Sequence, residues 1–258
     1  MGFMVELRET RLNELAQVPA DDMEYVVIDA GGGPGVVALI VSSILQESLE
    51  TLKTAEIHSP HFPQVTLINN EGVASPPKIE VFLARPRIDS RQALIIISRN
   101  FIVETTEAGE EISELLFNYL SQLRIRRFVF LTSGRVSASG DVYASSTDLE
   151  SVRRLVRLGA KVATNIDTLP VDRLASSLML RFHLSSKPMD VLISDTMGLA
   201  PDLASAKKVL AILSEYLGIP IDTSKLDAEI EKQRRLLEEA SKFFEEMGRE
   251  GGAPSYIG

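Results

Sequence analysis

A glycine-dense turn, Gly31-Gly32-Gly33-Pro34-Gly35, is the first place in this sequence where residue types and spacing could carry chemistry. It follows the β-branched run Tyr25–Asp29 and precedes an apolar segment that starts at Val36. That order is typical of a buried strand, a tight loop and a helix that returns over the sheet. Such loops often bind phosphate, because backbone N–H groups at the start of the helix face the ligand. The first question is therefore whether this turn binds a nucleotide.

The residues around the turn match nucleotide-binding motifs poorly. A P-loop would place a lysine after the last glycine, whereas Gly35 is followed by four apolar residues, 36–39, and no cation. A looser dinucleotide pattern runs through Gly33, Gly35 and Ala38, with Glu56 near the distance expected of a ribose-binding acid. Glycines are also needed wherever a strand-to-helix turn must avoid clashes. We favour a tight structural turn or an interface and keep the weak dinucleotide match as an alternative.

Two other groups of polar residues could carry chemistry. His58 and His61 are three positions apart with Glu56 close by, but a metal site needs at least one more converging ligand, so we expect loop histidines. Thr132-Ser133-Gly134 ends an apolar run, at the sheet edge where α/β enzymes place polar groups. The nucleophile motif G-x-S-x-G is absent, because leucine and arginine occupy its glycine positions. We predict no catalytic residue, no metal ligand and no cofactor site.

The elements that would position these residues alternate between strands and helices. Short apolar or β-branched runs predict strands over Tyr25–Asp29, Thr54–His58, Val65–Ile68, Ile79–Ala84, Arg91–Ser98, Arg126–Thr132, Val142–Ala144, Lys161–Ala163 and Met189–Ser194. Apolar stripes predict helices over Val36–Glu50, Thr106–Leu123, Asp148–Leu158, Val171–Leu184, Asp202–Leu217 and Ser224–Met247. The first 22 residues have no clear periodicity. The alternation predicts a three-layer α/β/α sandwich with a mostly parallel central sheet and a long C-terminal helix.

We divide the chain into an α/β core domain (1–222), a C-terminal amphipathic helix (223–247) and a flexible tail (248–258). The helix has a heptad-like seam of seven positions, all apolar except Gln233: Leu226, Ile230, Gln233, Leu237, Ala240, Phe244 and Met247. Packing between subunits and packing on its own domain both produce such a seam. The tail contains four glycines and a proline, with Tyr256 and Ile257 near its end. That pattern is typical of a tether with a tip that docks into a partner.

Composition narrows the class of partner. The net charge of −9 disfavours a nucleic-acid partner, which needs a basic face. The chain has no cysteine, which excludes disulfides and thiolate sites. The N-terminus lacks the pattern of a signal peptide, and the longest apolar run, Val36–Val41, is far shorter than the roughly 20 residues that span a bilayer. We expect a soluble, cytoplasmic protein with no nucleic-acid or membrane partner.

Taken together, these stretches resemble the proteasome-assembly chaperone family, specifically the branch named for the second eukaryotic chaperone and its archaeal homologues. The turn Asp29–Val36 and the phenylalanine–proline loop Ser59–Pro63 carry part of the resemblance. The most specific block is Asp195–Ala206, which continues to Leu217–Asp222, and Val142–Thr147 fits more weakly. The resemblance covers most of the chain.

The resemblance implies a sandwich similar to the nucleoside-phosphorylase fold but without its activity. It also implies a homo-oligomer that engages α-subunits of the proteasome core particle. In archaeal relatives, C-terminal segments ending in hydrophobic–tyrosine–any residue are thought to enter pockets between α-subunits. Here Tyr256 is third from the end rather than second, so this sequence departs from that ending.

We therefore expect a non-enzymatic assembly chaperone or adaptor for the proteasome. The expected partner-binding residues are Leu237, Phe244, Met247, Tyr256 and Ile257. The alternative is a nucleotide- or nucleoside-binding enzyme, phosphorylase-like or ATP-grasp-like. It would use the crevice above Gly31–Gly35, Ser98 and Thr132–Gly134. A third possibility is that the same body serves another oligomeric partner.

Overall fold

The computed structural model describes residues 9–19, 22–31, 33–68, 72–86, 93–137, 139–164, 166–196, 198 and 200–250. The chain divides into two compact units, Met1–Ile221 and Asp222–Gly258. In the described residues, all strands and all helices except the last belong to the first unit.

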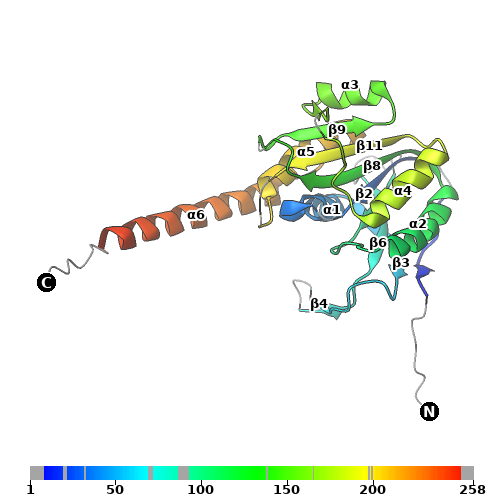
Figure 1. Ribbon diagram of the computed structural model, residues 1–258, viewed down its shortest axis with the longest axis horizontal. Helices are drawn as coiled ribbons and strands as arrows, with labels where there is room; N and C mark the ends of the chain where they lie inside the picture. The colour runs from blue at the N-terminus through cyan, green and yellow to red at the C-terminus, as the bar shows by residue number, and fades with distance from the viewer. Residues whose placement is uncertain are drawn as a thin grey trace, which may run out of the picture. The chain divides into compact units, whose positions relative to one another are not determined.

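The first unit is built on a nine-stranded sheet with the order β1-β3-β6-β7-β2-β8-β11-β9-β10 (Figure 1). Its strands are β1 (Arg11–Glu14), β2 (Asp22–Asp29), β3 (Glu50–His58), β6 (Ile79–Arg85), β7 (Leu94–Ser98), β8 (Arg124–Gly134), β9 (Val142–Ser146), β10 (Lys161–Val162) and β11 (Met189–Asp195). The four central strands β7, β2, β8 and β11 are parallel, and antiparallel pairs join β1, β3 and β6 on one side and β9 on the other. The sheet is therefore parallel at its centre and mixed towards its edges.

Helices cover both faces of this sheet (Figure 1). Helices α2 (Thr106–Ser121) and α4 (Arg173–Leu184) pack together on one face, and α1 (Val37–Ser48), α3 (Leu149–Arg157) and α5 (Leu203–Leu217) lie on the other. A single 3₁₀ turn, η1 (Pro34–Val36), precedes α1. The predicted three-layer α/β/α sandwich is confirmed.

The central strands are apolar on both sides because both sides are covered. Residues of β7 and β11 are buried without exception in the structure. Alternate residues of β8 divide between the two layers, so that Phe128 and Phe130 belong to the cluster formed with α2 and α4. Phe182 of α4 stacks on Phe128 with ring centroids 3.8 Å apart. Full burial of side chains of this size stabilises a fold by about 1.5–3 kcal/mol each.

Most predicted elements lie where the periodicity placed them, but three strands differ, two of which, Arg11–Glu14 and Ala74–Ser75, were not predicted. The edge strand β1 was not predicted, because its sequence Arg-Leu-Asn-Glu is mostly exposed and is held by pairing with β3 rather than by apolar alternation. The strand predicted over Val65–Ile68 is reduced to β4 (Leu67–Ile68). It pairs only with β5 (Ala74–Ser75), outside the large sheet.

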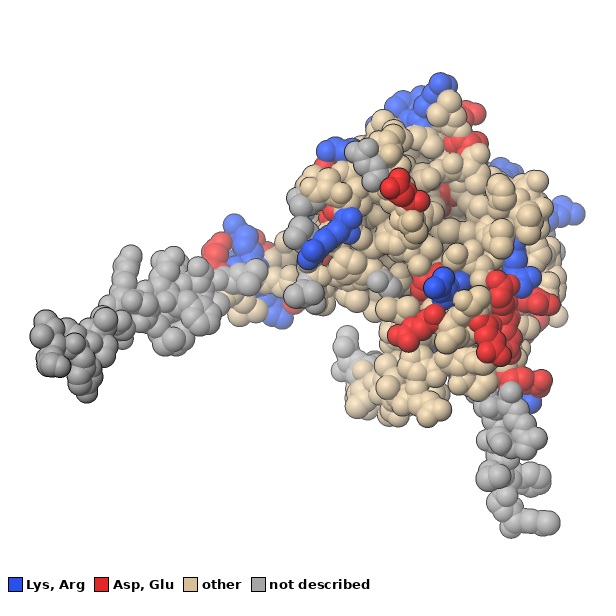
Figure 2. Space-filling view, in the orientation of Figure 1, with Lys and Arg blue, Asp and Glu red and all other residues tan. Residues whose placement is uncertain are grey.

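Charged side chains are segregated on the face shown in Figure 2, where Asp and Glu gather over α2 and Lys and Arg gather over α3. The exposed acidic residues of α2 include Glu107, Glu110 and Glu114, and the exposed basic residues of α3 are Arg153, Arg154 and Arg157. Arg154 is engaged locally, since it donates to the Tyr216 carbonyl at 2.6 Å and its guanidinium lies over the Tyr216 ring. The basic cluster is therefore small and partly committed to packing.

The second unit contains α6 (Ser224–Glu250), a helix of 27 residues. Ion pairs along its own surface join Arg234 to Glu231 at 2.8 Å and Lys232 to Glu229 at 3.4 Å. Leu236 on this helix is 57% exposed. Helices within the described ranges include none that is long and apolar enough to cross a membrane.

Candidate functional site

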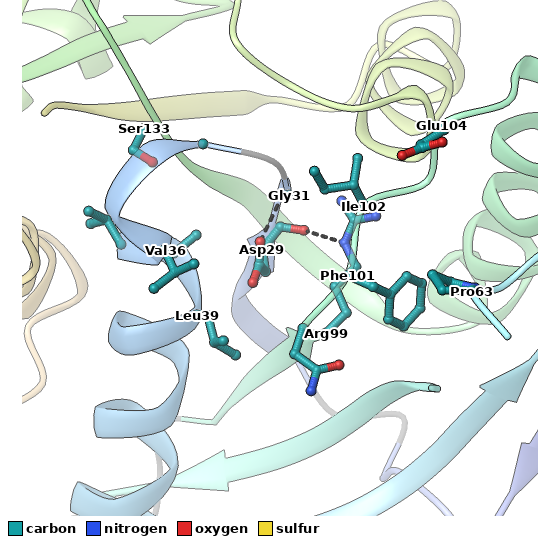
Figure 3. A pocket seen from close by; sticks show the side chains of 14 residues that line it. Asp29, Gly31, Val36, Leu39, Pro63, Arg99, Phe101, Ile102, Glu104 and Ser133 are labelled. Carbon is teal, nitrogen blue, oxygen red and sulfur yellow. Dashed lines mark hydrogen bonds between the residues drawn. The ribbon is translucent and has the colours of Figure 1, made fainter. Parts of the chain in front are cut away.

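A cleft of about 410 Å³ opens at the carboxyl ends of the central strands, beside the glycine turn (Figure 3). Its floor and one wall come from the end of β2 and the start of α1, with Asp29, Val36 and Leu39 among the lining residues. The opposite wall is the segment after β7, which contributes Arg99 and Ile102. The cleft thus lies between two segments that are far apart in the sequence, since Asp29 and Arg99 are separated by 70 positions.

The topology of the sheet explains this position. From β2 the chain passes through α1 to strands on the β7 side, whereas from β7 it passes through α2 to β8 on the other side of β2. Because α1 and α2 cover opposite faces, the connections diverge above β2 and leave a crevice outside the carboxyl ends of the strands. Ligand sites of open α/β sheets commonly lie at such a point.

The glycines of the turn are required by close packing. A Cβ atom at Gly31, where φ is +71°, would lie 2.7 Å from Nη2 of Arg99 and 2.8 Å from Oδ2 of Asp172. A Cβ atom at Gly33 would lie 2.0 Å from Oγ of Ser133. No larger residue fits at either position without moving its neighbours. The glycines are thus explained without a phosphate ligand.

A buried ion pair between Arg99 and Asp172 holds the two walls of the cleft together. The two side chains are 1% and 2% exposed, with N–O distances of 2.5 and 2.8 Å between them. Asp172 also accepts from the backbone N–H of Val103 at 2.8 Å and of Ala175 at 3.0 Å, and in this way caps the N-terminus of α4. Arg99 Nε donates to the carbonyl of Asp29 at 3.2 Å. Three chain segments, the end of β2, residues 99–103 after β7 and the start of α4, therefore meet at one buried pair.

Asp29 is a buried carboxyl group at the floor of the cleft. It is 4% exposed, and its Oδ1 accepts from the Gly31 N–H at 2.8 Å. Burial raises the pKa of Asp29 to about 6, although the nearby Arg99 guanidinium and the Gly31 N–H oppose the shift. The negative charge of Asp172 raises the pKa of Asp29 further by repulsion. The group therefore changes its charge close to physiological pH.

Val36, at the start of α1, holds a backbone conformation that a β-branched residue rarely adopts, with φ 44° and ψ 36°. Neighbouring hydrogen bonds keep the turn in place: Ser133 Oγ donates to the Pro34 carbonyl at 2.7 Å, and the Asp202 N–H donates to the Gly35 carbonyl at 2.9 Å. The helix also begins without a side-chain cap, whereas α2, α3, α4 and α5 each begin with a capping Thr or Asp. Strain of this kind collects at functional sites.

Other polar residues at this edge of the sheet are engaged in structural bonds. The Thr132 hydroxyl donates to the Pro170 carbonyl. Burial alone would raise the pKa of Asp195, but backbone N–H groups of residues 136, 139 and 137 hold its pKa far below the usual range. Asp195 thereby fixes the loop after β8. Asp202 accepts from Thr196 Oγ1 at 2.5 Å and from the Ser205 N–H at 2.9 Å, which starts α5.

The structure brings together only part of the predicted crevice. Gly31, Gly33 and Ser133 line the cleft, whereas Ser98, Thr132 and Gly134 do not. Sequence reasoning missed Arg99, Asp172 and the buried state of Asp29. Asp172 could have been found as a helix cap, because it directly precedes the apolar periodicity of α4.

The histidines do not converge. His58 Nε2 lies 3.4 Å from Glu56, and His61 Nε2 lies 3.0 Å from Glu111 of α2. Glu56 is instead held by Lys53 and Lys78, at 2.8 and 2.6 Å. Within the part of the chain that the structure describes, no group of three or more His, Cys, Asp or Glu residues could hold a metal ion.

The predicted partner-binding residues lie in the second unit. Leu237, Phe244 and Met247 belong to α6, but their side chains are outside the described part of the structure. Tyr256 and Ile257 lie outside the described residues altogether.

Residues 27–241 of this chain match the PAC2 family. No curated protein matches the sequence at a significant level. The fold is similar to that of PbaB from Pyrococcus furiosus, an archaeal proteasome activator, at 22% identity and a TM-score of 0.76, covering 90% of this chain and 99% of that chain. It is also similar to PbaA of the same organism, an archaeal homolog of proteasome-assembly chaperone, at 20% identity and a TM-score of 0.71, covering 93% and 95%. A proteasome-assembly chaperone homologue from Mycobacterium tuberculosis is 15% identical with a TM-score of 0.64, covering 84% and 94%.

The buried ion pair can be tested by a double-mutant cycle. We expect Arg99→Met to lower the free energy of unfolding by about 3–5 kcal/mol, because Asp172 is left buried without its counter-charge. Adding Asp172→Asn should recover a large part of that loss, since asparagine still caps α4. Arg126→Met, at an exposed pair 3.3 Å from Glu24, should change stability by less than about 1 kcal/mol. Urea unfolding of these three variants and of Asp172→Asn alone completes the cycle. A loss of stability at Arg99 as small as that at Arg126 would contradict the assignment.

The charge of Asp29 can be tested by the pH dependence of stability. Because the folded-state pKa is raised from 3.8 to about 6, the protonated carboxyl favours the fold at low pH and this contribution is lost as pH rises through 6. Asp29→Asn should therefore leave stability nearly unchanged at pH 4 and increase it by roughly 2–3 kcal/mol at pH 8. Unfolding free energies at the two pH values give the difference. A gain in stability of equal size at both pH values would show that the charge of Asp29 is not the cause of the gain.

Backbone strain at Val36 can be tested by a residue that accepts the left-handed conformation. We expect Val36→Asn to raise the free energy of unfolding by about 1 kcal/mol, because asparagine tolerates a positive φ and residue 36 is 44% exposed. The matched change Val37→Asn should destabilise by about 2 kcal/mol or more, since that side chain is 1% exposed. Thermal unfolding monitored by circular dichroism compares the two. Destabilisation by both would argue against strain at Val36.

Proposed function

The chain belongs to the PAC2 family, and from this premise we propose that it is a non-enzymatic assembly chaperone or adaptor of the proteasome. Its partners would be α-subunits of the proteasome core particle, and it would act as a cytoplasmic homo-oligomer. Support comes from the family match over residues 27–241 and from the similarity of the fold to proteins named as a proteasome activator and as proteasome-assembly chaperone homologues.

The observation that carries this proposal is the separate compact unit formed by α6. An isolated helix is stabilised mainly when an amphipathic face packs against another surface. Six of the seven seam positions of α6 are apolar, its flanks carry Glu–Arg and Glu–Lys pairs, and Leu236 is 57% exposed. A helix of this kind is suited to bind a groove on a partner through anchors at spacings of three and four.

In this proposal Leu237, Phe244 and Met247 are the anchors, and Tyr256 and Ile257 form the tip of a flexible tail that reaches pockets on the α-ring. The body of the protein would gather several copies, so that several tails act together. Linked weak contacts gain affinity from their high local concentration. The chaperone would thereby hold α-subunits side by side without any chemical step.

The experiment is a binding assay of the full chain with proteasome α-subunits. Replacing Leu237, Phe244 and Met247 together with glutamate should weaken binding by about tenfold or more, since buried apolar anchors dominate such interfaces. Deleting residues 251–258 should weaken it independently. The control Glu239→Gln changes an exposed position of the same helix and should bind as the wild type does. Absence of binding by the full chain would overturn the proposal, and unchanged binding after the deletion would remove the tail from it.

A nucleotide- or nucleoside-binding function is the second candidate, because the cleft lies where α/β folds place such ligands. The charge of the cleft argues against a ligand that carries phosphate. Arg99 is the only cation among the described lining residues, and its guanidinium is already paired with Asp172.

A further inference from the structure

The cleft beside the glycine turn has the size and composition of a small-molecule site. Its volume of about 410 Å³ lies within the range of roughly 300–1,000 Å³ that is typical of ligand pockets. Apolar side chains from three segments line it: Val36 of η1 with Leu39 of α1, Phe101 and Ile102 after β7, and Pro63. Phe101 is fixed by Phe62, whose ring centroid is 4.5 Å away. The walls are therefore apolar and largely preformed.

The opening of the cleft is flanked by exposed apolar groups. Val36 is 44% exposed and Ile102 is 45% exposed, and they stand on opposite sides of Asp29 (Figure 3). Val36 is held there in spite of its strained backbone. A bound apolar group would cover both side chains, and this contact would offset part of the strain.

The charged groups at the cleft are mainly negative. Asp29, Arg99 and Glu104 line it, and Asp172 lies directly behind Arg99. Three carboxyl groups thus lie in or directly behind the cleft, together with one guanidinium that is already engaged through all three of its nitrogens. The uncapped N-terminus of α1 adds only about half a positive charge. An anionic ligand would be repelled, and a cation would be attracted.

Asp29 is the group that a cation would reach. Its carboxyl lies between the Gly31 turn on one side and Val36 and Leu39, at the start of α1, on the other (Figure 3). Oδ1 accepts from the Gly31 N–H, and a carboxylate offers about four acceptor positions in all. An ammonium group bonded to this carboxylate would supply the counter-charge that burial otherwise denies it.

We infer that this cleft binds a small apolar amine, whose ammonium group donates hydrogen bonds to Asp29 and whose hydrocarbon part packs against Val36, Phe101 and Ile102. This function is separate from the proposed contact with the proteasome, because it uses the first compact unit alone. A ligand in this class carries no phosphate.

The proposal is tested by calorimetric titration of the full chain with 2-phenylethylamine, 2-phenylethanol, phenylacetate and inorganic phosphate. The amine should bind about tenfold more tightly than the alcohol, because a hydrogen bond to an ionised group contributes roughly 1.5–3 kcal/mol. Phenylacetate and phosphate should bind more weakly than the alcohol. Equal affinity for amine and alcohol, tighter binding of either anion, or no binding of the amine up to about 10 mM would each overturn the inference.

Two further measurements separate the role of Asp29 from the apolar fit. Asp29→Asn should remove the preference for the amine but keep the affinity for the alcohol, whereas Asp167→Asn, an equal change of charge at an exposed position, should alter neither. Because the pKa of Asp29 is raised to about 6, the affinity for the amine should fall about tenfold between pH 7.5 and pH 5, and that for the alcohol should not. An amine preference that persists in Asp29→Asn would overturn the inference.

Discussion

The buried pair of Arg99 and Asp172 is the interaction on which the carboxyl edge of the sheet depends. Its side chains are almost completely excluded from water, so the pair is stable only because each charged group has several partners. Asp172 starts α4 and binds the backbone of Val103, while Arg99 binds the end of β2. One pair thus joins a central strand, its neighbour and the helix on one face. The glycine turn must pass close to the same pair, which is why Gly31 has no room for a side chain.

This arrangement changes what the fold can do at the place where related architectures bind phosphate. The turn is glycine-rich and leads into a helix, yet the guanidinium of Arg99 beside it is paired with Asp172, and the carboxyl of Asp29 beside it is buried. Charge, rather than shape, therefore decides the chemistry of the cleft. A buried carboxyl with a raised pKa beside apolar walls is suited to a cation with a hydrocarbon part.

The two proposals rest on separate parts of the chain. The match over residues 27–241 assigns the protein to the PAC2 family, and the proposed contact with the proteasome rests on the amphipathic helix α6. The cleft belongs to the first compact unit and needs no residue of α6. The polar groups after β8 and β11 are bonded to loops and helix starts.

The sequence by itself determined the elements and the layers, because burial on both faces leaves continuous apolar strands and burial on one face leaves helical stripes. The family resemblance could also be recognised from the sequence, because each of the short blocks around Gly31 and Asp195 is a contiguous stretch of residues. The sequence did not reveal β1, whose exposed residues depend on β3 for their hydrogen bonds. Arg99 and Asp172 are 73 positions apart, and Arg99 has no local pattern that identifies its partner. Only the tertiary structure decided that these charges meet beside Asp29 and that the cleft is negative, because the pairing and burial of charges depend on contacts distant in sequence.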